Sequence, residues 1–296
     1  MENMPARPMI RLFLVGCPRS GTTLLQSLLA AHSQLLSFPE THFFTKVLSP
    51  RPLLRNLGLA SPHARTRFYR ILEDIGHPHM HTHLPRFTVS RRQYSRAFVA
   101  LLDAVTQSQN KQGWLEKTPR HLHHVDEIRA RVPGAKFIHL IRNGEDVIAS
   151  LYEVIKAHPE RWVSMPAGDL DSCIARWIES IERSQHYLAA PDHAIVRYEQ
   201  LIEAPRDVLG HLCRFIGVSF EERMLEDARH HAATLVLPHE TWKQGVSQAI
   251  EPPRQRKFDR IFSEVERQHI MARIAQVNLA RFDRPERLCM MFPHGA

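Results

Sequence analysis

The amino-acid sequence predicts an α/β fold of three layers, in which helices cover both faces of a mostly parallel central sheet. Three observations lead to this prediction. The composition is that of a globular protein, with 43% hydrophobic and 24% charged residues in a chain of 296. Short apolar runs alternate with helical patterns along the chain. The first such pair is joined by a tight turn that two glycines bound.

The first unit is an apolar run at residues 10–15, typical of a strand buried on both faces, followed by a helical pattern at residues 22–31. Apolar runs predict three further strands, at residues 113–115, 136–141 and 194–196. Helical patterns lie between and after these strands, at residues 122–131, 145–156, 170–188, 206–216 and 264–280.

Residues 46–112 contain no convincing strand. Amphipathic helical patterns at residues 64–74 and 91–107 surround a loop rich in His and Pro. We interpret this region as a helical insertion that covers one end of the sheet. The sequence shows no internal repeat or convincing linker, so we expect a single domain over residues 1–296.

The charge and cysteine pattern restrict the compartment and the partners. Lys and Arg exceed Asp and Glu, and the formal net charge is +8, which suits an anionic ligand, an acidic substrate or a nucleic acid. The basic residues are spread out rather than gathered in one run, so the charge does not choose among these partners. We expect no nucleic-acid partner. No apolar run approaches the ~18 residues that span a bilayer, and the four cysteines form no C-x-x-C pair. We expect a soluble cytoplasmic protein.

The turn after the first strand has the pattern of a phosphate-binding loop. Gly16 and Gly21 have the spacing of G-x-x-x-x-G, which lets backbone N–H groups point at a phosphate, and the following helix adds its positive end. Thr22 and Thr23 stand where a Walker loop has Lys and Ser or Thr. Arg19 supplies a cation inside the loop instead. The loop is P-loop-like and suits a nucleotide anion other than a triphosphate.

A second anion site is indicated where the strand at residues 136–141 ends. Arg142 follows that strand, at the edge where open α/β sheets bind ligands. Ser150 lies about two helical turns further on and could share an anion with Arg142. Capping of a neighbouring helix or pairing with Glu145 would equally explain Arg142.

Two residues are candidates for the chemistry. Glu40 follows the first helix closely enough to face a transferred group and to accept a proton from an incoming hydroxyl. Lys117 lies just after the strand at residues 113–115, at the same sheet edge, and could stabilise developing negative charge. An exposed salt bridge for Glu40 and a solvated surface position for Lys117 remain alternatives.

These segments in this order resemble the sulfotransferases that use 3′-phosphoadenosine-5′-phosphosulfate (PAPS), and above all the branch of tyrosylprotein sulfotransferases and bacterial enzymes. Residues 17–23 are similar to that family's 5′-phosphosulfate loop. Arg142 with Ser150 is similar to its 3′-phosphate motif. The resemblance implies that the donor is held by Arg19, Ser20, Gly21, Thr22, Thr23, Arg142 and Ser150.

The same resemblance implies further roles. Tyr198 corresponds to a tyrosine beside the adenine, Glu40 to the catalytic base, and Lys117 to a lysine that stabilises the sulfuryl group. His42 stands where an arginine follows the base in this branch, which leaves the acceptor open, and it is an alternative or assisting base.

One cation of the 3′-phosphate site is replaced in this sequence. Val154 stands where the family has a second arginine for that phosphate. Lys156 could replace it, or Lys243 in a late loop that would cover the nucleotide.

The resemblance implies transfer of a sulfuryl group from PAPS, with 3′,5′-adenosine bisphosphate as the product and no metal. The acceptor would be a hydroxyl or amine of a small molecule, glycan, lipid or peptide. The histidines that alternate over residues 77–83, and those at residues 121–124, complete no recognisable zinc pattern. A small-molecule kinase with a degenerate P-loop and a non-catalytic nucleotide-binding module are the alternative functions, and the oligomeric state is left open.

Overall fold

The computed structural model describes residues 8–48, 52–84, 88–159, 169–228, 230–231 and 256–282. These residues include a five-stranded sheet of order β2-β3-β1-β4-β5, in which every neighbouring pair is parallel. The strands are β1 (Ile10–Gly16), β2 (Leu35–Phe38), β3 (Gly113–Lys117), β4 (Ala135–Ile141) and β5 (His193–Arg197). The predicted parallel α/β sheet is confirmed, including four of its five strands.

Strand β2 was not predicted from the sequence. Its four residues are too few to show the alternation that identifies a strand, and only two of them are buried. Pairing with β3 on one side alone makes this segment the edge of the sheet. The strand therefore depends on a partner almost 80 residues later in the chain, which no local pattern reveals.

The predicted helices all form, with two differences. The pattern at residues 122–131 becomes a 3₁₀ turn, Pro119–His124, followed by a short α-helix. The pattern at residues 264–280 ends early and continues as a 3₁₀ turn, Leu279–Phe282. The α-helices of the described residues are α1 (Thr22–Ala30), α2 (Pro52–Asn56), α3 (Ala64–Asp74), α4 (Arg91–Ser108), α5 (Val125–Arg131), α6 (Gly144–Ala157), α7 (Leu170–Gln185), α8 (Tyr198–Glu203), α9 (Pro205–Ile216), α10 (Arg223–Glu226), α12 (Lys257–Ile261) and α13 (Glu264–Ile274).

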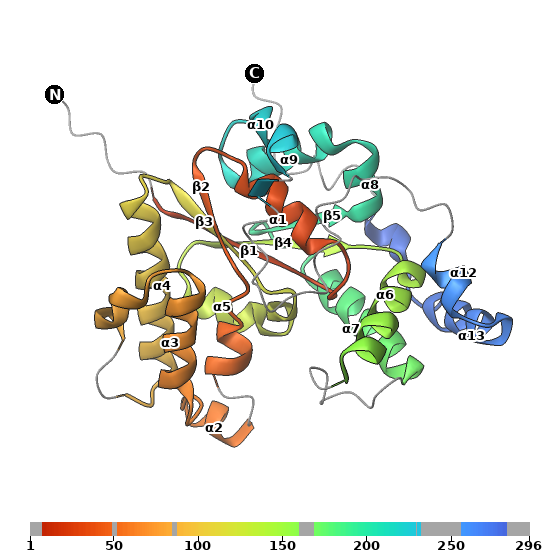
Figure 1. Cartoon of the computed structure of the whole chain (residues 1–296), viewed down its shortest axis with the longest axis horizontal. Coiled ribbons are helices and arrows are strands. Elements are labelled where there is room, and N and C mark those ends of the chain that lie inside the picture. Colours follow the sequence, from red (N-terminus) through yellow and green to blue (C-terminus); the bar gives the residue numbers. More distant parts are fainter. Residues whose placement is uncertain are drawn as a thin grey trace.

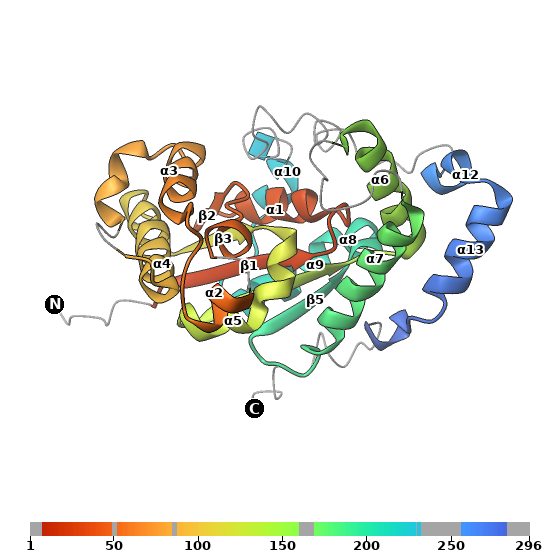
Figure 2. The same cartoon turned by 90° about the horizontal axis from the view of Figure 1, so that it is seen from below.

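The sheet lies between two layers of helices (Figure 1). Successive residues of β1 point to opposite faces, so Phe13 and Val15 pack with α4 and α5 while Leu12 and Leu14 pack with α1 and α9. Helices α6 and α7 form a third cluster with α12 and α13, which Figure 2 shows at the end of the molecule away from the insertion. None of the helices in the described part of the chain combines the length and apolar character that a membrane crossing requires.

The helical insertion lies between β2 and β3, as expected, and its helices are grouped at one end of the molecule (Figure 1). It begins with a π-helical turn, Phe43–Val47, and the predicted His-rich loop contains a 3₁₀ turn, Pro78–His83. Aromatic rings hold its core together. Phe43 stacks on Phe98 with ring centroids 4.1 Å apart, and Phe68 contacts Phe43 edge to face.

A largely buried ion pair connects α4 of the insertion to α5, which packs on one face of the sheet. Arg91 begins α4, is 1% exposed and donates to both carboxylate oxygens of Glu127 in α5. Burial alone would raise the pKa of Glu127, but hydrogen bonds from His124 and Arg91 outweigh it and lower that pKa from 4.5 to about 2. The carboxylate therefore stays ionised and holds its partner at neutral pH.

Replacement of this carboxylate tests the anchoring of the insertion. We expect Glu127→Gln to lower the free energy of unfolding at pH 7 by about 3 kcal/mol, because it leaves a buried guanidinium without its counter-charge. Chemical denaturation measures this. Glu264→Gln, which removes an exposed pair with Arg267, should leave the free energy of unfolding nearly unchanged.

The same pair gives the stability a defined pH dependence. Because the pKa of Glu127 is lower in the folded protein than in the unfolded chain, its contribution is complete above about pH 4.5 and is lost as the pH falls towards 2. The stability difference between the unaltered protein and Glu127→Gln should therefore shrink over that range. A difference that is constant down to pH 2 would contradict the ion pair.

Candidate active site

The candidate site residues meet at one edge of the sheet because its strands are parallel. Strands β1 and β3 end at two of the candidate residues, Gly16 and Lys117. Strands β4 and β5 are followed directly by two others, Arg142 and Tyr198. Elements separated by more than 100 residues in the chain thus contribute to a single site.

The predicted phosphate loop joins β1 to α1, and both of its glycines are required by close contacts. Gly16 has φ 155°, and a Cβ there would lie 2.5 Å from the carbonyl oxygen of Leu140 on β4. Gly21 has φ 94°, and a Cβ there would lie 2.4 Å from the ring of Tyr198. Only glycine fits at either position, so the G-x-x-x-x-G pattern has a steric cause in this chain.

Within the loop, Arg19 adopts a left-handed backbone conformation with φ 74°. Its Nε donates to the Ser150 hydroxyl in α6 at 3.0 Å, so this pair links the two predicted anion-binding motifs. Burial lowers the pKa of the Arg19 guanidinium, while Glu153 opposes that shift. In the structure the Ser150 hydroxyl accepts from Arg19, and an anion shared by Ser150 and Arg142 stays a prediction.

Next to Arg19, the side chain of Ser20 is buried and its Oγ has no hydrogen-bond partner among the described residues. Thr22 and Thr23, which begin α1, are also buried. Buried hydroxyls without partners are uncommon, because such a group loses its hydrogen bonds to water. The loop therefore offers a donor that a bound anion would satisfy.

Arg142 follows β4 and is held on two sides. Its guanidinium donates to Asp146 at 2.9 Å, and its Cζ lies 4.2 Å from the centroid of the Tyr198 ring. Its Nε is buried and has no hydrogen-bond partner in the part of the chain that the structure describes. Asn143 caps α6 by accepting from the Asp146 backbone N–H. The alternative explanation, a pair of Arg142 with Glu145, is not what the structure shows, since Arg142 pairs with Asp146 instead.

One cation near this arginine was missed in the sequence. Arg256, just before α12, is bonded to Glu145 and lies 3.5 Å from Asp146, the partner of Arg142. A basic run at residues 254–257 was the available signal. The ammonium of Lys156, one of the two expected substitutes, lies over the Tyr152 ring at 4.3 Å. Lys243, the other, lies outside the described residues.

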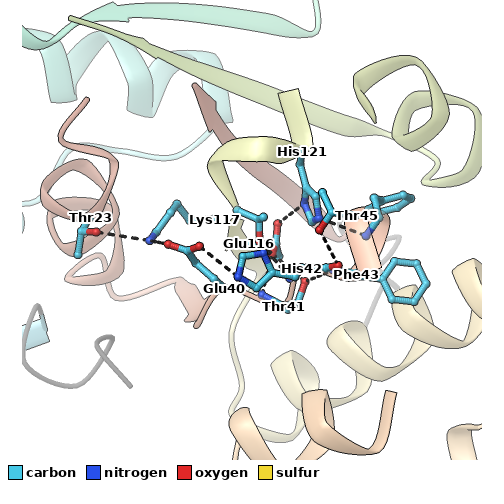
Figure 3. Close-up of polar contacts among 11 residues, drawn as sticks. Thr23, Glu40, Thr41, His42, Phe43, Thr45, Glu116, Lys117 and His121 are labelled. Carbon is cyan, nitrogen blue, oxygen red and sulfur yellow. Dashed lines mark hydrogen bonds and ion pairs between the residues drawn. The ribbon is translucent and has the colours of Figure 1, made fainter. Parts of the chain in front are cut away.

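Glu40, Lys117 and His42 form a cluster beside the phosphate loop (Figure 3). Lys117 is 2% exposed, and its Nζ lies 2.6 Å from Glu40 Oε1 and 3.4 Å from Thr23 Oγ1. Glu40 Oε2 lies 3.6 Å from His42 Nε2. The structure excludes both alternative interpretations. Lys117 is buried rather than solvated, and the salt bridge of Glu40 is largely buried rather than exposed.

The His42 imidazole is neutral at physiological pH. Burial lowers its pKa from 6.5 to about 4, although Glu40 acts in the opposite direction. It therefore supplies no positive charge in place of the arginine that the family resemblance led us to expect. A neutral imidazole can accept a proton, so His42 keeps the chemical character of a base.

No group of three or more His, Cys, Asp or Glu side chains among the described residues is arranged to hold a metal ion. The histidines at residues 121–124 instead have carboxylate partners. His121 contacts Glu116 at 2.9 Å, His123 contacts Glu179 at 3.4 Å and His124 contacts Glu127 at 3.6 Å.

Comparison with known proteins finds relatives that match most of this chain. Protein-tyrosine sulfotransferase 1 of Danio rerio is 27% identical over 227 residues, which cover 74% of this chain and 55% of that protein. An uncharacterised protein of Aquifex aeolicus is 28% identical over 224 residues, which cover 73% of this chain and 26% of that protein. The chain thus spans about a quarter to a half of the length of these relatives.

The fold also matches a solved structure. The sulfotransferase domain of a Synechococcus olefin synthase superposes with a TM-score of 0.56 and 23% identity, over 93% of this chain and 98% of that domain. The family model described as "Sulfotransferase family" matches residues 11–222, from β1 to the loop before α10. Since this match includes all five strands and the candidate site up to Tyr198, the chain belongs to the sulfotransferase family.

Proposed function

We propose that this protein transfers a sulfuryl group from PAPS to a hydroxyl or amine of an acceptor. The observation that carries the proposal is the pair of anion-binding elements at one sheet edge, the Arg19 loop and the Arg142 turn, joined by the bond from Arg19 to Ser150. Two buried polar atoms, Ser20 Oγ and Arg142 Nε, have no hydrogen-bond partner among the described residues and would be satisfied by a bound anion.

The donor would lie across both elements. In this proposal residues 19–23 hold the 5′-phosphosulfate with backbone N–H groups, hydroxyls and the Arg19 guanidinium. Arg142, supported by Asp146, holds the 3′-phosphate, and Ser150 lies between the two groups. The Tyr198 ring, which packs on Arg142, would hold the adenine. Lys243 stays a prediction for the nucleotide site.

The proposed reaction is an in-line displacement at sulfur. Glu40 accepts the proton of the acceptor hydroxyl while that oxygen forms a bond to sulfur. The bond from sulfur to the 5′-phosphate oxygen breaks, and its electron pair leaves on 3′,5′-adenosine bisphosphate. Lys117, already 2.6 Å from Glu40, lies where it can balance the negative charge that develops on the sulfuryl oxygens. No metal is proposed, because these cations supply the counter-charge.

In this proposal the helical insertion that follows Glu40 forms the binding site for the acceptor. The relative from Danio rerio is named for protein tyrosine, but the neutral His42 removes a cation that the resemblance would require there. A small molecule, glycan, lipid or peptide hydroxyl therefore remains the proposed class. A kinase function has less support, because the Walker lysine is absent and the chain belongs to another family.

Transfer of label tests the function. Incubation with sulfur-labelled PAPS and a cell extract should yield a product heavier by one sulfuryl group, detected by mass spectrometry. With that acceptor, Glu40→Gln should lower kcat by at least about 100-fold, because it removes the proton acceptor, without weakening binding of adenosine 3′,5′-bisphosphate.

His42→Gln is the matched variant for the base. It should retain more than about a tenth of kcat, since an assisting group contributes less than the base itself. The reverse order of the two variants would assign the base to His42. Binding of PAPS without any labelled product would refute the transferase, and Mg²⁺-dependent ATP binding without bisphosphate binding would favour a kinase.

Removal of Arg142 tests the nucleotide site. We expect Arg142→Met to weaken binding of adenosine 3′,5′-bisphosphate by roughly 10- to 100-fold, which is the value of one or two hydrogen bonds to a charged group. Calorimetry with adenosine 5′-phosphosulfate, which lacks the 3′-phosphate, should show a much smaller change. Equal loss for both ligands would contradict this assignment. Arg206→Met, at an exposed pair with Glu222, should affect neither ligand.

A further inference from the structure

Glu116 is a fully buried carboxylate directly before Lys117, and no step of the proposed reaction uses it. Four donors surround it. Its Oε1 accepts from the Thr41 backbone N–H at 3.2 Å, from the Thr41 hydroxyl at 2.8 Å and from the Thr118 hydroxyl at 2.6 Å. Its Oε2 accepts from His121 Nδ1 at 2.9 Å. Burial alone would raise the pKa of Glu116, but His121 and these hydrogen bonds lower it, so the group is ionised.

This cluster fixes four successive backbone N–H groups at the start of the insertion. The N–H of Thr41 donates to Glu116, that of His42 to the Thr118 hydroxyl at 3.2 Å, that of Phe43 to the Thr41 hydroxyl at 3.2 Å and that of Phe44 to His121 Nε2 at 3.2 Å. These groups begin a π-helical turn that has no side-chain cap of its own. The segment that carries Glu40 and His42 is therefore held by β3 and the turn after it.

The tautomer of His121 is set by the same contacts. Its Nε2 accepts the Phe44 backbone N–H, so that nitrogen carries no proton. The ring proton is therefore on Nδ1 and is donated to Glu116. The ring is buried against Phe44, with centroids 5.3 Å apart. Because a backbone N–H is always a donor, Nε2 of His121 has to stay the acceptor and Nδ1 the donor.

The two faces of β3 place neighbouring residues in different roles. Glu116 and Lys117 are consecutive, so their side chains point to opposite sides of the strand. Glu116 reaches Thr41 on one side, and Lys117 reaches Glu40 on the other (Figure 3). Two consecutive residues of β3 thus contact two consecutive residues, Glu40 and Thr41, of the segment after β2.

We propose that Glu116 is a positioning residue, whose buried carboxylate holds residues 40–44 so that Glu40 faces Lys117 and the transferred group. This inference rests on the function proposed above and assigns Glu116 no contact with donor or acceptor. Its effect on the reaction passes through Glu40.

Glu116→Gln is the informative change, because an amide cannot accept hydrogen bonds from the donors on both sides of this side chain. One side of Glu116 meets the Thr41 backbone N–H and the other meets the His121 N–H, so the NH₂ group faces a fixed donor in either orientation. With the acceptor found by labelled PAPS, kcat should fall about 100-fold, the scale expected for a catalytic group displaced by about 1 Å. The dissociation constant for adenosine 3′,5′-bisphosphate should change by less than about twofold.

A double-mutant cycle with Glu40→Gln separates positioning from simple loss of stability. If Glu116 acts through Glu40, adding Glu116→Gln to Glu40→Gln should lower kcat by less than about twofold further. Glu127→Gln is the matched control, because it removes another carboxylate, a partly buried one that pairs with Arg91 of the insertion. It should lower the thermal midpoint while leaving kcat within about twofold.

The outcomes distinguish this inference from the function on which it rests. Equal losses of kcat from Glu116→Gln in both backgrounds, or a loss of bisphosphate binding as large as the loss of kcat, would overturn the positioning role in an active enzyme. A complete absence of PAPS consumption by the unaltered protein would instead refute the proposed function, and the role of Glu116 with it.

Discussion

The parallel pairing of β1 with β3 on one side and β4 on the other is the constraint on which the rest of the structure depends. Its register sets Leu14 opposite Lys117 and Gly16 opposite Leu140, so both neighbours end beside the phosphate loop. The close approach of Gly16 to β4 follows from the same register. A shift by one residue would turn Lys117 to the other face of the sheet and separate it from Thr23.

Edge strand β2 extends this constraint to the catalytic candidate. Phe38 pairs with Glu116, so the two residues that follow Phe38 lead the chain towards the end of β3. There Glu40 meets Lys117 while Thr41 meets Glu116. A short strand that contributes little to the core therefore sets where the proposed base lies, and the buried hydrogen bonds of Glu116 keep the segment from relaxing into other conformations.

Charge is balanced locally within the site. Lys117 lies against Glu40, Arg142 against Asp146, and Arg256 against Glu145 and Asp146. Such pairing lowers the electrostatic free energy needed to bring several cations together at a partly buried edge, since each cation keeps a counter-charge within 4 Å. It also orients the side chains in advance, which reduces the conformational freedom that a bound anion would have to remove.

The sequence by itself determined the strand, turn and helix that build the phosphate loop, the positions of Arg142 and Lys117 at strand ends, and the insertion, because each depends on local periodicity or on residues a few positions apart. The tertiary structure alone decided that β2 is a strand, that Arg19 bonds Ser150, that Arg256 joins Asp146 and that Glu116 anchors Thr41. These contacts join segments about 75 to 130 residues apart. Their existence depends on strand register and on burial, which set the partners of a polar side chain and which no local pattern encodes.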